Sequence, residues 1–234
     1  MPDMPAHRTA RERARAELTV AIKEEARIQL ADRGAGGLSL RAVARELGMV
    51  SSAIYRYFPS RDHLLTALIL DAYTALADAL DAAVQTAGEA TFADRWRAAA
   101  HAMRDWAHAH PHEYALLYGT PVPGYQAPRD TVGPAGRVPG AFLGIVADAW
   151  RAGTLDPPDP SPVSAPHTQV RQIIDALELP DLPDDAVVAA IDAWTQLFGA
   201  IALEINGQFV GSFDPADDYV AHAVELQVHL VGLS

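Results

Sequence analysis

Apolar residues in the first quarter of the chain recur at helical spacing and are interrupted by residues that end helices. Residues 11–33 predict a first helix, because apolar side chains repeat every four residues on one face. These side chains are Leu18, Ile22, Ala26 and Leu30. Glycines follow, and Ser39 is then placed as the N-cap of a short second helix over 40–47 that ends at Gly48.

The rest of the chain keeps a helical pattern, and no segment alternates apolar and polar residues as a half-buried strand does. Further helices are predicted at about 51–58, 61–85, 91–109, 111–118, 140–152, 184–209 and 215–231. Two stretches rich in proline and glycine, 120–139 and 156–166, predict loops. The pattern therefore predicts an all-α protein.

Composition narrows the class of protein. Half of the 234 residues are apolar, which is enough for a substantial core. The absence of cysteine excludes disulfides, thiolate metal sites and cysteine nucleophiles. No run of about 18 apolar residues and no signal-peptide pattern is found. We expect a cytoplasmic protein without a membrane span and without a cofactor.

The formal net charge of −12 is divided unevenly along the chain. Residues 1–62 hold eleven of the 18 basic residues but only eight of the 30 acidic ones, so they carry +3 and residues 63–234 carry −15. This asymmetry indicates a polyanionic partner for the first part only. Chance drift of charge along solvated helices is the alternative interpretation.

Residues 40–58 carry a pattern that two tightly crossed helices require. Such helices need a small side chain at the crossing, a turn residue without a Cβ, and a branched apolar side chain from the second helix. Ala44, Gly48 and Ile54 supply these three parts. Any helix-glycine-helix segment can imitate this spacing, so the side chains of the second helix decide between the interpretations.

Those side chains suit the groove of a duplex better than a protein core. If Ile54 and Phe58 face inward, the residues that face outward are polar or amphipathic. They are Ser51, Ser52, Tyr55 and Arg56. Small residues permit close approach to DNA, and tyrosine and arginine donate hydrogen bonds to phosphates and base edges. The segment therefore predicts a helix-turn-helix with an exposed recognition helix.

The same residues resemble the TetR family of bacterial repressors. The resemblance is carried by Gly34, by LRAVARELG over 40–48 and by AIYRYFPSRDHLL over 53–65, and it is dense over about 15–66. It implies a three-helix DNA-binding domain over 1–62. It also implies a larger helical domain over 63–234 that binds an effector and dimerises.

The resemblance further implies which residues meet DNA. Ser39, Arg41, Tyr55, Tyr57 and Arg61 would lie at phosphates, whereas Val50, Ser51, Ser52, Ala53 and Arg56 would approach base edges. Arg61 stands where the family usually has lysine, and it keeps the charge. Val50 stands where serine or alanine often caps the recognition helix, which leaves Ser51 or Ser52 to cap it.

Near the C-terminus, apolar residues repeat with spacings of four and three, as in helices packed nearly parallel or antiparallel. The resemblance implies a four-helix bundle across a two-fold axis. The candidate interface residues are Ile191, Trp194, Phe198, Ile201, Ala202, Ile205, Val220, Val224 and Val228. The alternative is that the stripe is the core of a single chain. The run from Ala193 to Ile201 is also similar to a TetR subgroup with a Trp-His-Gly signature, although Phe198 replaces the histidine.

By the same resemblance, aromatic residues and one histidine of the middle helices are candidates for an effector site, although they fit a plain core as well. They are Trp96, His101, Trp106, Tyr114, Tyr118, Phe142 and Trp150. His108, His110 and His112 alternate, but Pro111 favours a helix end there rather than metal ligation. No metal site is predicted.

The sequence supports an enzyme least, because it lacks Gly-x-Ser-x-Gly, His-Glu-x-x-His and glycine-rich phosphate-binding motifs. We expect a homodimer that binds a near-palindromic operator in double-stranded DNA and represses a gene until a small lipophilic effector releases it. A DNA-binding regulator or architectural protein without an effector is the other alternative.

Overall fold

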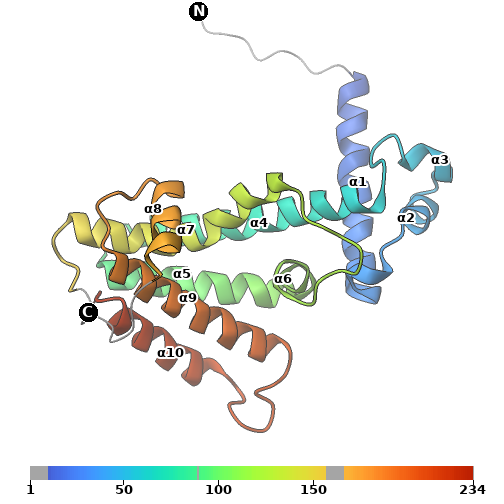
Figure 1. Cartoon of the computed structure of the whole chain (residues 1–234). Helices are drawn as coiled ribbons and strands as arrows, with labels where there is room; N and C mark the ends of the chain where they lie inside the picture. The colour runs from blue at the N-terminus through green and yellow to red at the C-terminus, as the bar shows by residue number, and fades with distance from the viewer. Residues whose placement is uncertain (1–9, 89, 157–165, 234) are drawn as a thin grey trace, which may run out of the picture. The chain divides into compact units, whose positions relative to one another are not determined.

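The computed structural model describes residues 10–88, 90–156 and 166–233, and within these ranges the chain forms helices and no strand (Figure 1). The elements in chain order are α1 (Ala10–Arg33), η1 (Ala35–Gly37), α2 (Leu40–Glu46), α3 (Ser51–Ile54), α4 (Arg61–Ala87), α5 (Phe92–Ala109), α6 (Pro111–Tyr118), η2 (Arg129–Thr131), α7 (Val132–Arg151), α8 (His167–Ala176), α9 (Asp184–Ile205) and α10 (Asp217–Leu230). The prediction of an all-α protein is confirmed.

The chain forms two compact units. The first comprises the residues up to Ala72 together with His112–Thr131, and the second comprises Tyr73–Pro111 and the residues from Val132 onward. Helix α4 therefore begins in the first unit and ends in the second. The predicted division into 1–62 and 63–234 is a division by role and stays a prediction. As a packed body, the first unit also contains the start of α4 and residues His112–Thr131, which are called the α6 segment below.

The core of the first unit is built on the predicted apolar face of α1. Ile22, Ala26 and Leu30 are buried, and Leu18 is half-buried. The residues that complete this core come from α2, α3, α4 and the segments that flank α2 and α3, and they are Leu38, Leu40, Val43, Ala44, Ile54, Phe58, Leu64, Leu65 and Leu68. Because these residues come from four helices, burying the apolar face of α1 also fixes α2 and α3.

The second unit packs α5, α7, α9 and α10 against one another. Thr91 caps α5, since its hydroxyl oxygen accepts a hydrogen bond from the Asp94 backbone N–H at 3.1 Å. Helix α9 is long and apolar enough to span a membrane, and it is alone in this among the helices of the described ranges. Eight of its residues are buried against the rest of the unit, so it packs as a core helix of the fold.

Several predicted boundaries were wrong. The predicted loop 120–139 ends at Thr131, because α7 accommodates its glycines and carries Pro139 inside the helix. Helix α8 was not predicted at all. The predicted helix 51–58 is four residues long and continues as turns. Of the predicted loop 156–166, residues 157–165 lie outside the described part of the chain.

Candidate DNA-binding site

The turn between α2 and α3 has the construction that the sequence predicts. Ala44 and Ile54 are completely buried where the two helices meet. Gly48 adopts a φ of 65°, a left-handed conformation that glycine reaches without the steric penalty of a Cβ. The Met49 N–H then donates to the Ala44 carbonyl at 2.8 Å, which closes the turn. The steric part of the prediction is confirmed.

Helices α2 and α3 are capped differently at their N-termini. At α2, the Ser39 hydroxyl accepts from the Ala42 N–H at 3.4 Å, as predicted. At α3, Val50 is the N-cap residue and provides no side-chain hydrogen bond. The expectation that Ser51 or Ser52 caps α3 is therefore wrong, since both lie inside the helix. Both hydroxyls are left on the surface.

Residues 50–58, which comprise α3 with its N-cap residue and the turns that follow, are called the recognition segment, and their outward side faces solvent. Ile54 and Phe58 face the core, whereas the outward residues Val50, Ser51, Ser52, Tyr55 and Arg56 are exposed. Ala53 and Tyr57 are half-buried, and Arg41 is exposed on α2. The orientation is the predicted one, and contact of these residues with DNA stays a prediction.

Arg61 has a structural role that the sequence did not indicate. Its Nη2 donates to the Ala35 carbonyl at 2.7 Å and to the Gly36 carbonyl at 3.3 Å, so the first residue of α4 is tied to η1. The side chain is only partly accessible. A phosphate contact from Arg61 would have to use its remaining N–H groups, and this contact stays a prediction.

Arg15 of α1 is a second residue that sequence reasoning missed. Its Nη2 donates to the Arg56 carbonyl at 3.0 Å, and its guanidinium lies 5.3 Å from the centroid of the Tyr57 ring. Both contacts are to the end of the recognition segment. The available signal was that Arg15 continues the spacing of Leu18 and Ile22 towards the N-terminus.

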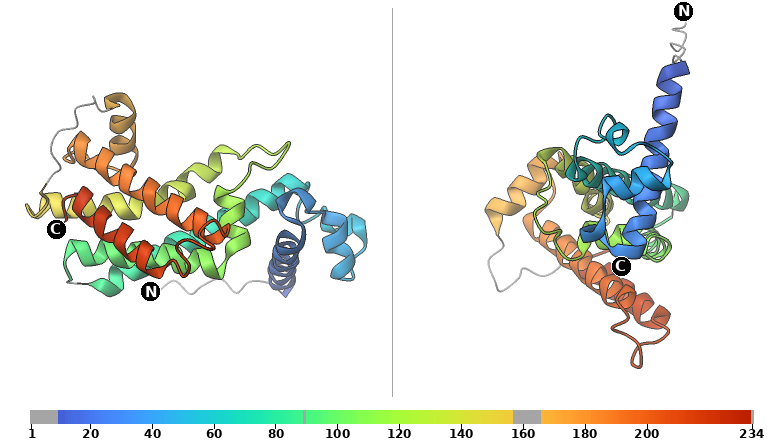
Figure 2. Two further views of the ribbon diagram at one scale, coloured as in Figure 1. Left: turned by 90° about the horizontal axis from the view of Figure 1, so that it is seen from below. Right: turned by 90° about the vertical axis from the view of Figure 1, so that its right-hand side faces the viewer.

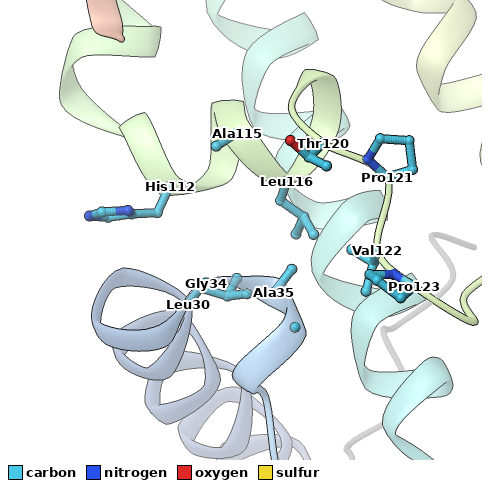
Figure 3. Close-up of a pocket in the computed structure, with 11 residues that line it drawn as sticks. Leu30, Gly34, Ala35, His112, Ala115, Leu116, Thr120, Pro121, Val122 and Pro123 are labelled. Carbon is cyan, nitrogen blue, oxygen red and sulfur yellow. The ribbon is translucent and has the colours of Figure 1, made fainter. Parts of the chain in front are cut away.

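Charged side chains join α1 to α4 and α6 within the first unit. Asp71 accepts from Lys23 at 2.8 Å and from Arg27 at 3.0 Å. Arg27 also donates to Glu113 of α6 at 2.9 Å. Alongside these ion pairs is a cavity of about 360 Å³, which Ala35 lines from one side and Leu116 and Val122 from the other (Figure 3). Leu116 and Val122 also pack against the core of the first unit, so residues 112–131 are held on the DNA-binding helices by both polar and apolar contacts.

The candidate effector residues are divided between the two units. Trp96 and Phe142 are core residues of the second unit, with ring centroids 5.0 Å apart. Tyr114 and Tyr118 form a separate pair in the first unit, and burial raises the pKa of the Tyr114 hydroxyl. Trp106 is also buried and lies against His110. His101 and Trp150 are on the surface.

The candidate interface residues fall into two groups. Ile201, Val220, Val224 and Val228 are each at most 2% exposed, because α9 and α10 turn them into the core of the second unit. They fit the single-chain alternative. The other five, Ile191, Trp194, Phe198, Ala202 and Ile205, are half-buried. Leu203 and Leu226, which the sequence analysis did not select, are 47% and 53% exposed.

The alternating histidines have different surroundings. His108 Nε2 lies 3.1 Å from a Glu204 carboxylate oxygen. Among the described residues, no group of three or more histidine and acidic side chains is placed to hold a metal ion. Glu204 also pairs with Arg104, which pairs with Asp217, so the contact of His108 is part of an ion-pair network of the second unit.

Two family models match the chain. One, described as bacterial regulatory proteins of the tetR family, covers residues 22–68, and the other, described as a tetracyclin repressor-like C-terminal domain, covers residues 96–226. The HTH-type transcriptional regulators Rv1816 of Mycobacterium tuberculosis and Mb1846 of Mycobacterium bovis are each 47% identical to the chain over 205 residues, or 84% of this chain and 84% of each relative.

Solved structures agree with this assignment. The crystal structure of SCO4313, described as a regulatory protein, is 34% identical and superposes with a TM-score of 0.74 over 94% of this chain and 100% of that one. A protein of unknown function from Rhodococcus sp. RHA1 is 26% identical, with a TM-score of 0.69 over 98% and 100% of the two chains. The family consists of regulators and not of enzymes, and the chain belongs to the TetR family of DNA-binding transcriptional regulators.

Proposed function

We propose that the protein is a homodimeric repressor whose two recognition segments enter successive major grooves of a near-palindromic operator. The observation that carries this proposal is the outward presentation of Ser51, Ser52, Tyr55 and Arg56 from α3 and the turn that follows it. One such unit reads too few base pairs to be selective, so two are needed. Exposed apolar side chains at Leu203 and Leu226, on α9 and α10, support pairing of the second unit with a second copy.

Selection of duplexes from a random library should test the dimer and the operator together. We expect an inverted repeat whose half-sites are about one helical turn apart, or a multiple of it. The mass of the complex, measured by light scattering, should correspond to two chains per duplex. Recovery of a single asymmetric site bound by one chain would contradict the proposal.

Arg56→Ala should weaken binding to the selected duplex by about tenfold to a hundredfold and relax its sequence preference, because a base-edge contact is lost. Fluorescence anisotropy of a labelled duplex measures this change. Arg129→Ala is the matched control, since Arg129 is an exposed arginine of the first unit on η2, outside the helix-turn-helix. Equal losses from both variants would show that total charge, and not the recognition segment, decides affinity.

We propose that a small lipophilic effector releases the operator. Two hollows are large enough for such a molecule. One is the cavity of about 360 Å³ between η1 and the α6 segment. The other, of about 450 Å³, lies in the second unit and is lined by Val132, Gly136, Gly140 and Leu177, among other residues. Occupation of the first would act directly on the helices that carry the recognition segment.

A melting screen with lipophilic compounds tests the effector. A compound present at about a hundred times its dissociation constant should stabilise the protein by about 2.7 kcal/mol. Because linkage is reciprocal, the same compound should weaken binding to the selected duplex. A compound that raises the melting temperature but leaves the affinity for DNA unchanged would contradict release by that ligand, and would favour a regulator without an effector response.

We also infer that the second unit belongs to the TetR subgroup with the Trp-His-Gly signature. Trp194 and Gly199 stand in α9 at the places of the signature tryptophan and glycine. Phe198 takes the place of the histidine and stacks on Trp194, with ring centroids 5.9 Å apart. A phenyl ring cannot donate a hydrogen bond, so the contact at this position is apolar in this chain.

A further inference from the structure

The first two turns of α1 extend past the core of the first unit. Residues 10–17 are all exposed, whereas burial on this helix begins with Leu18 and is complete at Ile22. In Figure 1 and in the right-hand view of Figure 2 this end of α1 projects beyond the loops around α3. These turns bury no apolar surface, so a contribution to the core does not explain them.

The face of these turns that continues the core face is basic. At 100° per residue, Arg11 and Arg15 each lie within about 20° of the direction of Ile22. Arg13 points to the opposite side of the helix by the same geometry. Glu12 and Glu17 lie about 80° and about 140° away from the Ile22 direction. One stripe of α1 is therefore apolar where it meets the core and cationic where it passes beyond it.

Arg15 fixes where this cationic stripe lies. It donates to the Arg56 carbonyl at 3.0 Å and covers the Tyr57 ring at 5.3 Å, so the stripe runs past the end of the recognition segment. Arg11 stands four residues, or about one helical turn, further out on the same face, about 6 Å along the axis. A duplex bound to the recognition segment would bring its backbone near this end of α1.

We propose that α1 adds its own contact to the DNA interface, with Arg11 binding a backbone phosphate and Arg15 acting as a positioning residue for the recognition segment. The proposal rests on the proposed binding of DNA by that segment. The arginine fork suits a phosphate. Residues 63–234 carry a net negative charge that repels DNA, so each cation at the interface contributes more to binding. The family model that covers the helix-turn-helix begins only at residue 22, so both arginines lie outside it.

A salt titration distinguishes a phosphate contact from general attraction. The probe is a labelled duplex of about 30 base pairs, in one arm the selected sequence and in the other an arbitrary one, with the full-length chain. Arg11→Ala should lower the slope of log affinity against log salt by about 0.9 and weaken binding about eightfold at about 0.1 M salt, in both arms. Arg13→Ala removes the same charge from the opposite face of the same helix and should change both quantities much less.

The outcomes separate the two proposals. If Arg11→Ala and Arg13→Ala have the same effect, or if Arg11→Ala has none, the contact from α1 is overturned. If Arg56→Ala leaves binding unchanged, the role of the recognition segment fails instead, whatever Arg11 does.

Arg15 requires a different readout, because it acts through the recognition segment. Arg15→Gln should lower the ratio of affinities for the selected and arbitrary duplexes by about fivefold, as expected for the loss of one hydrogen bond, whereas Arg11→Ala should preserve that ratio. Arg15→Lys keeps a cation over Tyr57 and should restore most of it. An unchanged ratio in Arg15→Gln, with the melting temperature preserved, would overturn the positioning role. A melting temperature lowered equally in both Arg15 variants would show a structural role only.

Discussion

Trp96→Ala is expected to lower the free energy of unfolding by about 4 kcal/mol. Trp96 is completely buried in α5, and its ring meets that of Phe142 edge to face, with centroids 5.0 Å apart. Its indole N–H also donates to Gln227 Oε1 at 3.3 Å. Truncation would leave a cavity and remove the donor from Gln227, which is itself completely buried. Urea unfolding followed by far-ultraviolet circular dichroism measures the loss.

Trp150→Ala provides the matched control. Trp150 lies near the end of α7 in the same unit and is 36% exposed. Its truncation removes the same atoms but leaves no closed cavity, so the loss should be well below that of Trp96→Ala. Equal losses would mean that Trp96 does not hold the core together. If the Trp96→Ala protein has normal stability but is no longer stabilised by a compound that stabilises the wild type, Trp96 would instead be assigned to the effector site.

The helix-turn-helix could be predicted from the sequence because its rules are local. The small Ala44, the left-handed Gly48 and the inward Ile54 lie within eleven residues, and their spacing alone describes the crossing. The exposed face of α3 follows from the same register. The local pattern did not predict the N-cap of α3, which is Val50 and makes no side-chain hydrogen bond.

Contacts between distant residues could not be predicted in this way. The carbonyl partners of Arg15 and Arg61 lie 41 and 25 to 26 residues away, and a charged residue in a sequence gives no sign of which backbone it will reach. Proline and glycine over 120–139 indicated a loop, yet α7 spans Pro139. Its buried residues, which include Phe142 and Val146, explain why packing overrides local propensity there.

The interface at the C-terminus shows a different limit. A seam between two helices of one chain and a seam between two chains produce the same apolar spacing. Val220, Val224 and Val228 follow that spacing and lie in the core of the unit. The exposed Leu226 is on the same helix but does not follow that spacing. Burial in the folded chain was therefore needed to separate the candidate surface from the core.

Glu204→Gln is expected to destabilise the protein by about 3 kcal/mol at neutral pH, because it breaks a largely buried ion pair. The Glu204 carboxylate accepts two hydrogen bonds from Arg104, at 2.6 and 2.9 Å, and the two side chains are only 11% and 14% exposed. Arg104 also donates to Asp217 at 3.0 Å. The bidentate pair joins α5 to α9, and the variant would leave the guanidinium without its main counter-charge. Urea unfolding measures the difference.

The same pair should make this difference depend on pH in a defined direction. Hydrogen bonding from Arg104 lowers the pKa of Glu204 below its ordinary value of 4.5. A depressed carboxylate pKa contributes stability that is fully present above 4.5 and is lost as the pH falls through the folded-state pKa. The stability gap between wild type and Glu204→Gln should therefore be constant near neutrality and close in acid. Glu225→Gln removes an equally bidentate pair, with Arg97, but Glu225 is 56% exposed, so solvent screening should make its effect smaller. A gap that widens towards acid, or an equal effect of the two variants, would contradict the assignment of this stability to the buried pair.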